Sequence, residues 1–227
     1  MQLAASSALV IFDLDGTLAD TISDIAAAVN RTLSRFNVRP HEVDAYKLMV
    51  GEGFRLLMQK ALPPELADNG SLVERALEIA LADYSENCLV HTSLFPGVPE
   101  LLRVLAKSGR RLAVLSNKPD PMTKSLVKAL CGQIEFVAVW GNSPDRPRKP
   151  DPAAALRIAA MAGVEPQRCI FVGDSSTDML TARAAGMIAV GAEYGYRSHE
   201  ELAGAGAQFF IRSPFELADA LGLSSSS

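Results

Sequence analysis

The sequence predicts an α/β protein in which a parallel sheet carries helices on both faces and receives an all-helical insertion near its start. Three observations lead to this fold class. The unbroken apolar run from Ala8 to Phe12 is typical of a strand that is buried on both faces. From Asp20 to about Cys88 the apolar spacing is helical, and no convincing strand is expected there. From Leu94 onward, helical and strand-like segments alternate.

The first expected strand runs directly into two carboxylates, Asp13 and Asp15. On an extended chain, residues two apart leave on the same side, so both carboxylates would point the same way. Burying two like charges is costly unless a cation lies between them, and Mg²⁺ suits this place because it prefers oxygen ligands. Asp15-Gly16 alone could equally be a turn after a core strand. Three further polar clusters, each after another apolar run, favour a site.

The helical insertion divides into segments at its glycines and prolines. Asp20 or Thr21 is expected to cap the first helix, with Asp24 completing a capping box. Helices are expected from the cap to Leu33, at Val43–Met49, at Phe54–Leu62 and at Ser71–Asn87. We interpret residues 19–91 as a cap inserted into an α/β core of residues 1–18 and 92–227, with hinges near residues 18–19 and 89–96.

The remainder reads as repeated βα units. The expected strands are Leu112–Leu115, Phe136–Trp140, Cys169–Val172, Met187–Val190 and Gln208–Ile211, with helices at 96–109, 121–130 and 152–162, one that ends at Ala185, and one at 214–221. Such units imply a Rossmann-like parallel sheet, in which ligands bind beyond the carboxyl ends of the strands. All four polar clusters fall at those ends. The low-complexity tail Ser224–Ser227 is assigned no function.

Composition restricts the partners. The 227 residues carry a formal net charge of −4, which argues against nucleic acid or an anionic membrane as the main partner. Cys88, Cys131 and Cys169 form no C-x-x-C pair and suggest a reducing compartment. No stretch approaches membrane-spanning length without a charge. We therefore expect a soluble, cytoplasmic protein, either a monomer or a homodimer.

The four clusters occur in a specific order: Asp13 and Asp15, then Ser116, then Lys149, then Asp174 and Asp178. In this order they resemble the motifs of the haloacid dehalogenase-like superfamily. The segments Asp-Leu-Asp-Gly-Thr-Leu, Ser-Asn-Lys-Pro, Lys-Pro-Asp-Pro and Gly-Asp-Ser-x-x-Asp are similar to those of its phosphoglycolate phosphatase branch. The resemblance covers essentially the whole chain, including the position of the helical insertion.

This resemblance implies a phosphatase that acts through an aspartyl-phosphate. Asp13 would be the nucleophile, and Asp15 would protonate the leaving alkoxide and later activate water. Ser116 and the Asn117 amide would donate hydrogen bonds to phosphoryl oxygens, while Lys149 would supply positive charge to them. The implied partner is a small phosphorylated metabolite, with 2-phosphoglycolate leading.

The resemblance also implies a Mg²⁺ site. Its ligands would be Asp13, Asp174 and Asp15, the last through its backbone carbonyl. Asp178 would hold the metal's waters or Lys149 in place. Gly16 would let the backbone approach the phosphate closely.

The insertion is expected to set the choice of substrate. Gly51-Glu52-Gly53-Phe54-Arg55 reads as a glycine-flexed loop that enters a helix, whose N-terminus favours an anion. In similar enzymes this loop dips toward the active site, which makes Gly51 and Arg55 candidates for contact with a second substrate anion such as a carboxylate. The alternative is a plain turn with Arg55 on the surface.

Other readings stay open. Taken singly, Ser116 is a strand-end turn residue, Lys149 a solvated charge, and Asp174 and Asp178 helix caps. Among enzymes, a β-phosphoglucomutase-like mutase or a pyrophosphatase or nucleotide phosphatase remains, whereas Asp15 argues against a true haloacid dehalogenase. From a different class, the chain could be an inactive phospho-ligand-binding protein, although no catalytic position is missing.

Overall fold

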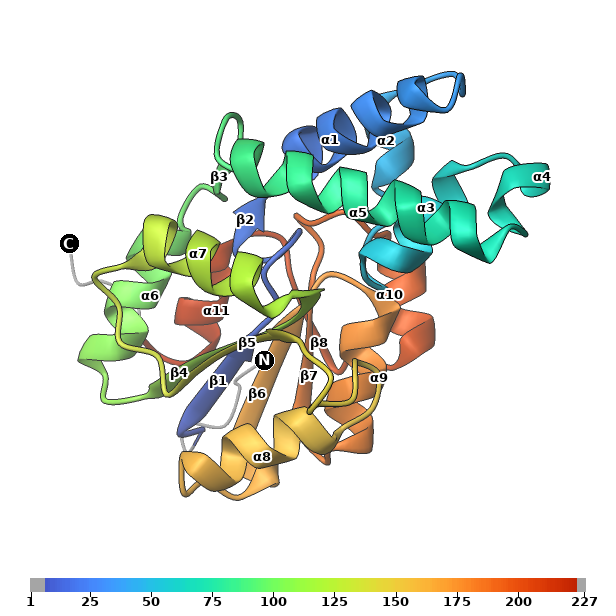
Figure 1. Cartoon of the computed structure of the whole chain (residues 1–227). Coiled ribbons are helices and arrows are strands. Elements are labelled where there is room, and N and C mark those ends of the chain that lie inside the picture. Colours follow the sequence, from blue (N-terminus) through green and yellow to red (C-terminus); the bar gives the residue numbers. More distant parts are fainter. Residues whose placement is uncertain (1–6, 224–227) are drawn as a thin grey trace.

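A six-stranded sheet runs through the molecule in the order β5-β4-β1-β6-β7-β8, and each neighbouring pair is parallel (Figure 1). The strands are β1 (Leu9–Phe12), β4 (Arg111–Pro119), β5 (Ala138–Asn142), β6 (Cys169–Gly173), β7 (Ile188–Ala192) and β8 (Phe209–Ile211). The computed structural model describes residues 7–223, so the tail Ser224–Ser227 lies outside it. The predicted fold class is confirmed.

The central strand β1 is completely buried because helices cover both faces of the sheet. Its side chains alternate between two apolar cores: Val10 and Phe12 face one, Leu9 and Ile11 the other. The first core is closed by α6 (Val98–Lys107), α7 (Asp120–Cys131) and α11 (Pro214–Ala220); the second by α8 (Ala153–Met161), α9 (Ser176–Ala184) and α10 (His199–Ala205). Each such buried side chain stabilises the fold by roughly 1.5–3 kcal/mol, so the strand end that carries Asp13 is firmly held.

The helical insertion forms a layer beyond the carboxyl ends of the strands (Figure 1). Its helices are α1 (Ile22–Arg35), α2 (Val43–Tyr46), α3 (Phe54–Ala61), α4 (Pro64–Ala67) and α5 (Gly70–Asn87). The layer holds together through apolar side chains that face inward, and Tyr46 and Tyr84 are among the largest that are fully buried. The short helices α4 and α10 were not predicted; α10 is capped by Ser198, whose hydroxyl accepts from the Glu201 backbone N–H.

The two connections between the sheet and the insertion pair with each other. β2 (Ala19–Asp20) and β3 (Ser93–Leu94) form an antiparallel pair close to both predicted hinges. The predicted capping box at the start of α1 is wrong. Instead, the Asp24 carboxylate accepts from the backbone N–H groups of His91 and Thr92 and from the Thr92 hydroxyl, at 2.8–3.0 Å. Asp24 therefore ties the start of α1 to the second connection.

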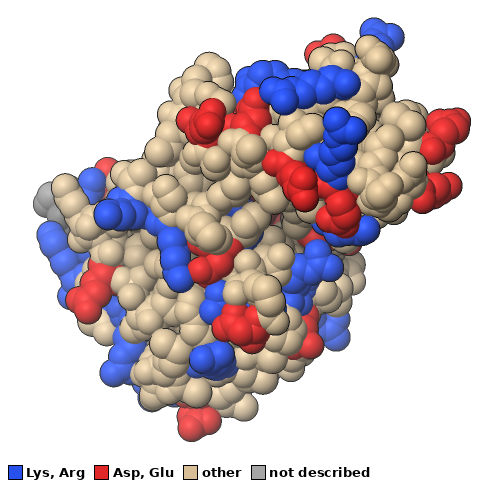
Figure 2. Space-filling model, viewed as in Figure 1, with Lys and Arg blue, Asp and Glu red and all other residues tan. Residues whose placement is uncertain are grey.

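The surface mixes charges of both signs. Lys and Arg are interspersed with Asp and Glu over the face in Figure 2, as the small net charge leads one to expect. Within residues 7–223, every helix is too short or too polar to cross a membrane.

Candidate active site

The structure gathers the predicted motif residues at the carboxyl edge of the sheet. Asp13 directly follows β1, Ser116 lies in the last part of β4, and Asp174 directly follows β6. Lys149 comes from the loop after β5, and Asp178 from the first turn of α9. All five are buried. Because the strands are parallel, their ends meet at one edge, which explains why residues so distant in sequence come together.

Three of these side chains form an acidic cluster. Asp13, Asp174 and Asp178 each offer a carboxylate oxygen, and these oxygens all lie within 4.8 Å of one another. The Lys149 ammonium lies 2.9 Å from Asp13 Oδ1 and 2.6 Å from Asp178 Oδ1. The Lys149 ammonium thus forms ion pairs with both carboxylates.

Burial and the neighbouring charges shift the pKa values of the groups in this cluster. Desolvation raises the pKa of Asp13 to about 7, although the Lys149 ammonium opposes the rise. Desolvation and the neighbouring carboxylates Asp178 and Asp13 raise the pKa of Asp174 well above its ordinary value. Burial lowers the pKa of Lys149, but Asp13 and Asp178 outweigh this and raise it above its usual range.

The cluster fits a divalent cation. When all three carboxylates are ionised, the one ammonium leaves two negative charges uncompensated in a buried place. A hard cation with oxygen ligands would neutralise them, and the three carboxylates offer it oxygen ligands. Of the three carboxylates, Asp178 is held by the most hydrogen bonds, because its Oδ2 also accepts from the Ser175 N–H and hydroxyl at 3.1 and 2.6 Å. Asp178 is therefore placed between Ser175 and Lys149.

Gly16 brings the backbone against this cluster. With φ +84°, it has a conformation that L side chains rarely adopt, and a Cβ there would lie 2.2 Å from Asp174 Oδ2. The Asp174 carboxylate is further held by the Thr17 hydroxyl at 3.3 Å and the Tyr196 backbone N–H at 2.8 Å. The structure thus shows the Gly16 backbone close to Asp174, whereas the expected approach of Gly16 to the phosphate stays a prediction.

The Asp15 carboxylate points away from the acidic cluster. It accepts two hydrogen bonds from the Lys118 ammonium, at 2.8 and 3.0 Å, and one from the Thr21 hydroxyl at 2.6 Å. Thr21 therefore uses its hydroxyl on Asp15, and α1 begins without a side-chain cap from it. Lys118 was not predicted as a site residue, although it follows Ser116 and Asn117 in the Ser-Asn-Lys-Pro motif.

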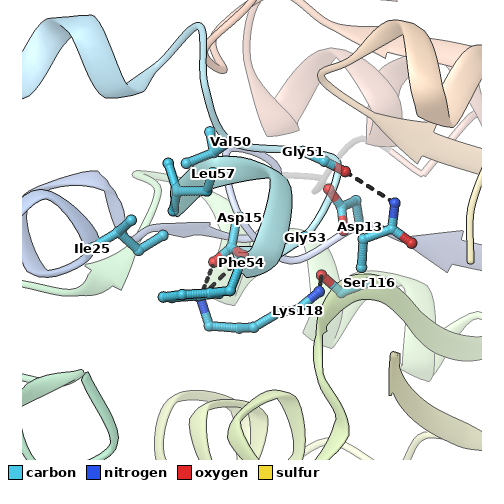
Figure 3. Close-up of a pocket in the computed structure, with 11 residues that line it drawn as sticks. Asp13, Asp15, Ile25, Val50, Gly51, Gly53, Phe54, Leu57, Ser116 and Lys118 are labelled. Atoms are coloured by element: carbon cyan, nitrogen blue, oxygen red, sulfur yellow. Dashed lines mark hydrogen bonds and ion pairs between the residues drawn. The ribbon is translucent and has the colours of Figure 1, made fainter. Parts of the chain in front are cut away.

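A small pocket opens between the sheet edge and the helical layer. From the sheet, Asp13, Asp15, Ser116, Asn117 and Lys118 line it; from the helical layer, Ile25, Val50, Gly51, Gly53, Phe54 and Leu57 do. In Figure 3, Asp13 and Ser116 lie on one side and Ile25 and Leu57 on the other, with the Asp15–Lys118 pair between them. The pocket therefore has a polar end at Asp13 and an apolar end. We call the apolar end, which is lined by Ile25, Val50, Phe54 and Leu57, the apolar chamber.

Donors from the sheet side hold the loop that covers this pocket. The carbonyl of Val50 accepts from Arg197 at 2.8 Å, that of Gly51 from the Asn117 side chain at 3.0 Å, and that of Glu52 from Arg148 at 3.1 Å. We call residues 50–53 with these three donors the loop clasp.

Besides its contact in the loop clasp, the side chain of Asn117 hydrogen-bonds to the backbone of Lys149. Its amide nitrogen also donates to the Lys149 carbonyl at 3.0 Å, and its oxygen accepts from the Lys149 backbone N–H at 2.9 Å. The side-chain amide is thus occupied by the backbone around it, and a contact with a phosphoryl oxygen would have to come from the main chain.

Arg55 is placed differently from the expectation. It lies on the exposed side of α3 and pairs with Glu74 of α5, with 2.6 Å between Nε and Oε1. Phe54, its neighbour, is buried and lines the pocket, whereas Arg55 is outside the set of described lining residues. The structure therefore brings Gly51 to the pocket and leaves Arg55 on the surface, as in the alternative reading.

Comparison with known proteins agrees with this geometry. A family model described as haloacid dehalogenase-like hydrolase matches residues 8–186. The chain is 40% identical over 191 residues to a phosphoglycolate phosphatase of Pseudomonas putida, covering 83% of this chain and 70% of the relative. It is 37% identical over 219 residues to a phosphoglycolate phosphatase of Rhodospirillum rubrum, covering 94% and 90%.

A solved structure is similar over nearly its full length. It is that of a provisionally named phosphoglycolate phosphatase of Lactobacillus delbrueckii subsp. bulgaricus, with a TM-score of 0.86, 29% identity, and coverage of 95% of this chain and 98% of that one. The family resemblance inferred from the four motifs and the prediction of a hydrolase are both confirmed. The chain belongs to the haloacid dehalogenase-like hydrolases.

Proposed function

We propose that the chain is a Mg²⁺-dependent phosphomonoesterase that forms an aspartyl-phosphate on Asp13 and acts on 2-phosphoglycolate. The observation that carries the reaction type is the Asp13 carboxylate, buried in the acidic cluster, 2.9 Å from the Lys149 ammonium and open to the pocket. The substrate rests on the relatives, since both of those described above are named phosphoglycolate phosphatases.

Each residue of the site has a part in this reaction. An Asp13 oxygen attacks phosphorus, and the bond from phosphorus to the ester oxygen breaks. Lys149 and the Ser116 hydroxyl stabilise the negative charge on the phosphoryl oxygens. Asp15 protonates the departing alkoxide and then takes a proton from the water that hydrolyses the aspartyl-phosphate. Mg²⁺, held by Asp13, Asp174 and the Asp15 backbone carbonyl, would supply positive charge to the transferred group.

The helical layer acts in this proposal as a cap. Residues 19–91 would close over the substrate, exclude water from the acidic cluster and reopen for product release, with the β2–β3 pair at the hinge. We further propose that the protein works in the cytoplasm, which agrees with three free cysteines within residues 7–223, and that it is a monomer or a homodimer.

Phosphate release tests the proposed function. With Mg²⁺, 2-phosphoglycolate should give a kcat/KM at least about 100-fold above those of β-glucose 1-phosphate, pyrophosphate and nucleoside monophosphates, and EDTA should abolish the reaction. A different leading substrate would retain the chemistry and reject the substrate assignment. If no phosphate ester or anhydride is hydrolysed with any metal, the phosphatase proposal fails, and a mutase would then be revealed by a requirement for a bisphosphate activator.

The loop clasp should govern closure of the cap. A double variant, Arg148→Met with Arg197→Met, removes two of the donors that hold the loop. At about 0.5–1.5 kcal/mol for each hydrogen bond, the closed cap should lose about 1–3 kcal/mol, and kcat/KM for 2-phosphoglycolate should fall about 5–150-fold, mainly through KM. Steady-state kinetics measure this, with Arg103→Met, an exposed residue of α6, as the control. An unchanged KM would show that the clasp does not hold the cap closed.

A further inference from the structure

We propose that the Lys118 ammonium binds the second anionic group of the substrate, a carboxylate one or two carbons from the phosphate ester, and that Asp15 occupies it only while the pocket is empty. This inference rests on the proposed phosphatase function and names the residue that selects the substrate at that same site.

Lys118 is a buried cation whose single ionic partner within residues 7–223 is Asp15. Its side chain is fully buried, and its ammonium is paired with Asp15 at 2.8 Å. It also lies over the rings of Tyr84 and Phe54, 4.5 and 5.6 Å from their centroids. Aromatic faces stabilise a cation but do not replace an anion, so an ammonium in this place requires a counter-charge at every stage of the reaction.

The position of Lys118 in the pocket determines what it can meet. Among the residues that line the pocket, it is the cation, whereas Lys149 is engaged with Asp13 and Asp178 deeper in the site. Figure 3 shows its ammonium beside Asp15, between Asp13 and the apolar chamber. A phosphate ester with its phosphorus at Asp13 would therefore present its next few atoms to Lys118.

The walls around Lys118 favour a short anion over a sugar. From the helical layer, the chamber receives the side chains of Ile25, Val50, Phe54 and Leu57, which have no polar groups. A row of hydroxyls would lose its hydrogen bonds to water against these walls without gaining others. A single carboxylate needs only one strong donor, and the buried ammonium is one.

The pairing also links recognition to chemistry. When a substrate carboxylate takes over the ammonium, Asp15 loses its two hydrogen bonds from Lys118 and keeps the one from Thr21. The Asp15 side chain can then turn toward the ester oxygen that leaves. A substrate without the carboxylate leaves Asp15 held by Lys118, so it should react slowly as well as bind weakly.

A cycle of two substrates and two proteins tests this proposal. Ethyl phosphate matches 2-phosphoglycolate in length but carries a methyl group in place of the carboxylate. The wild type should prefer 2-phosphoglycolate by at least about 100-fold in kcat/KM, and Lys118→Met should reduce that preference to less than about 10-fold. Lys118→Arg, which keeps the charge, should retain more of the preference than Lys118→Met. Arg103→Met should leave the preference unchanged.

The outcomes separate this inference from the proposed function. Equal losses on both substrates in Lys118→Met, with the preference intact, would mean a merely structural role and would overturn the inference. Hydrolysis of both esters by the wild type without a preference would overturn it even if the variant fails to fold. If the wild type hydrolyses neither of these esters nor an aryl phosphate, the proposed function is wrong, and this inference, which rests on it, is wrong as well.

Discussion

Asp13→Asn should lower kcat for phosphate release by about 10⁴-fold or more, which is the largest effect we expect from one substitution. The amide has nearly the shape of the carboxylate but is a far weaker nucleophile, so the aspartyl-phosphate cannot form. Ser116, Lys149 and the metal would still bind the phosphoryl group, and any residual rate would come from that binding. The measurement is phosphate release at saturating 2-phosphoglycolate and Mg²⁺, with mass spectrometry to detect phosphorylated protein in the wild type alone.

The same variant should be more stable than the wild type when metal is removed. Burial raises the pKa of Asp13 to about 7 in the folded protein, against about 3.9 in an unfolded chain. A raised carboxyl pKa stabilises the fold fully below about pH 4, and this contribution is lost as the pH rises toward 7. In EDTA at pH 8, Asp13→Asn should therefore unfold about 2–8 °C above the wild type, and the difference should shrink as the pH falls toward 4.

This pair of measurements distinguishes lost chemistry from a damaged fold. An inactive Asp13→Asn protein with a lower unfolding temperature in EDTA would indicate structural damage and leave the nucleophile unassigned. Asp44→Asn, at an exposed position of α2, provides the matched control and should leave both activity and stability within about twofold and 1 °C of the wild type. Substantial activity in Asp13→Asn would exclude an aspartyl-phosphate on this residue.

The sequence sufficed for the sheet and for the position of Asp13 and Asp174 at one edge of it, because the apolar runs that end in these carboxylates are local signals. An apolar run that ends in a carboxylate places Asp13 at a strand end, and parallel strands bring Asp174 to the same edge. The burial of Lys118 could not be read in this way, since it depends on Tyr84 and Phe54, which reach it from the helical layer. A lysine in a polar motif is by default a solvated residue.

The structure also differs from the predictions at Arg55 and at Asp24, and each difference has a specific cause. The inward face of α3 is made by Phe54, Leu57 and Met58, and a helix turns about 100° per residue, so Arg55 points elsewhere. The apolar spacing that defines this inward face can be seen in the sequence, and it favours a surface position for Arg55. Asp24 is different, because its hydrogen-bond donors, His91 and Thr92, lie 67 and 68 residues along the chain. A partner at that separation has no local signal, whereas a capping box does.

Gly16→Ala should nearly abolish activity without changing any group that takes part in the reaction. A Cβ on Gly16 would lie 2.2 Å from Asp174 Oδ2 and 2.8 Å from the Tyr196 ring, and the residue would be held at φ +84°. Asp174 cannot retreat easily, because it is buried and its carboxylate is held by Thr17 and the Tyr196 N–H. We expect kcat/KM to fall about 10³-fold and the free energy of unfolding to fall about 1–3 kcal/mol.

Metal binding should identify the cause of that loss. If the methyl group acts by displacing Asp174, the Mg²⁺ concentration for half-maximal activity should rise about 10–100-fold, and saturating Mg²⁺ should restore part of kcat. The matched control is Gly70→Ala at the start of α5, where an added Cβ meets no heavy atom of the described chain within 4 Å, so activity and metal response should stay unchanged. Full activity with an unchanged metal requirement in Gly16→Ala would mean that the reaction tolerates a displaced Asp174, which would remove this carboxylate from the proposed metal site.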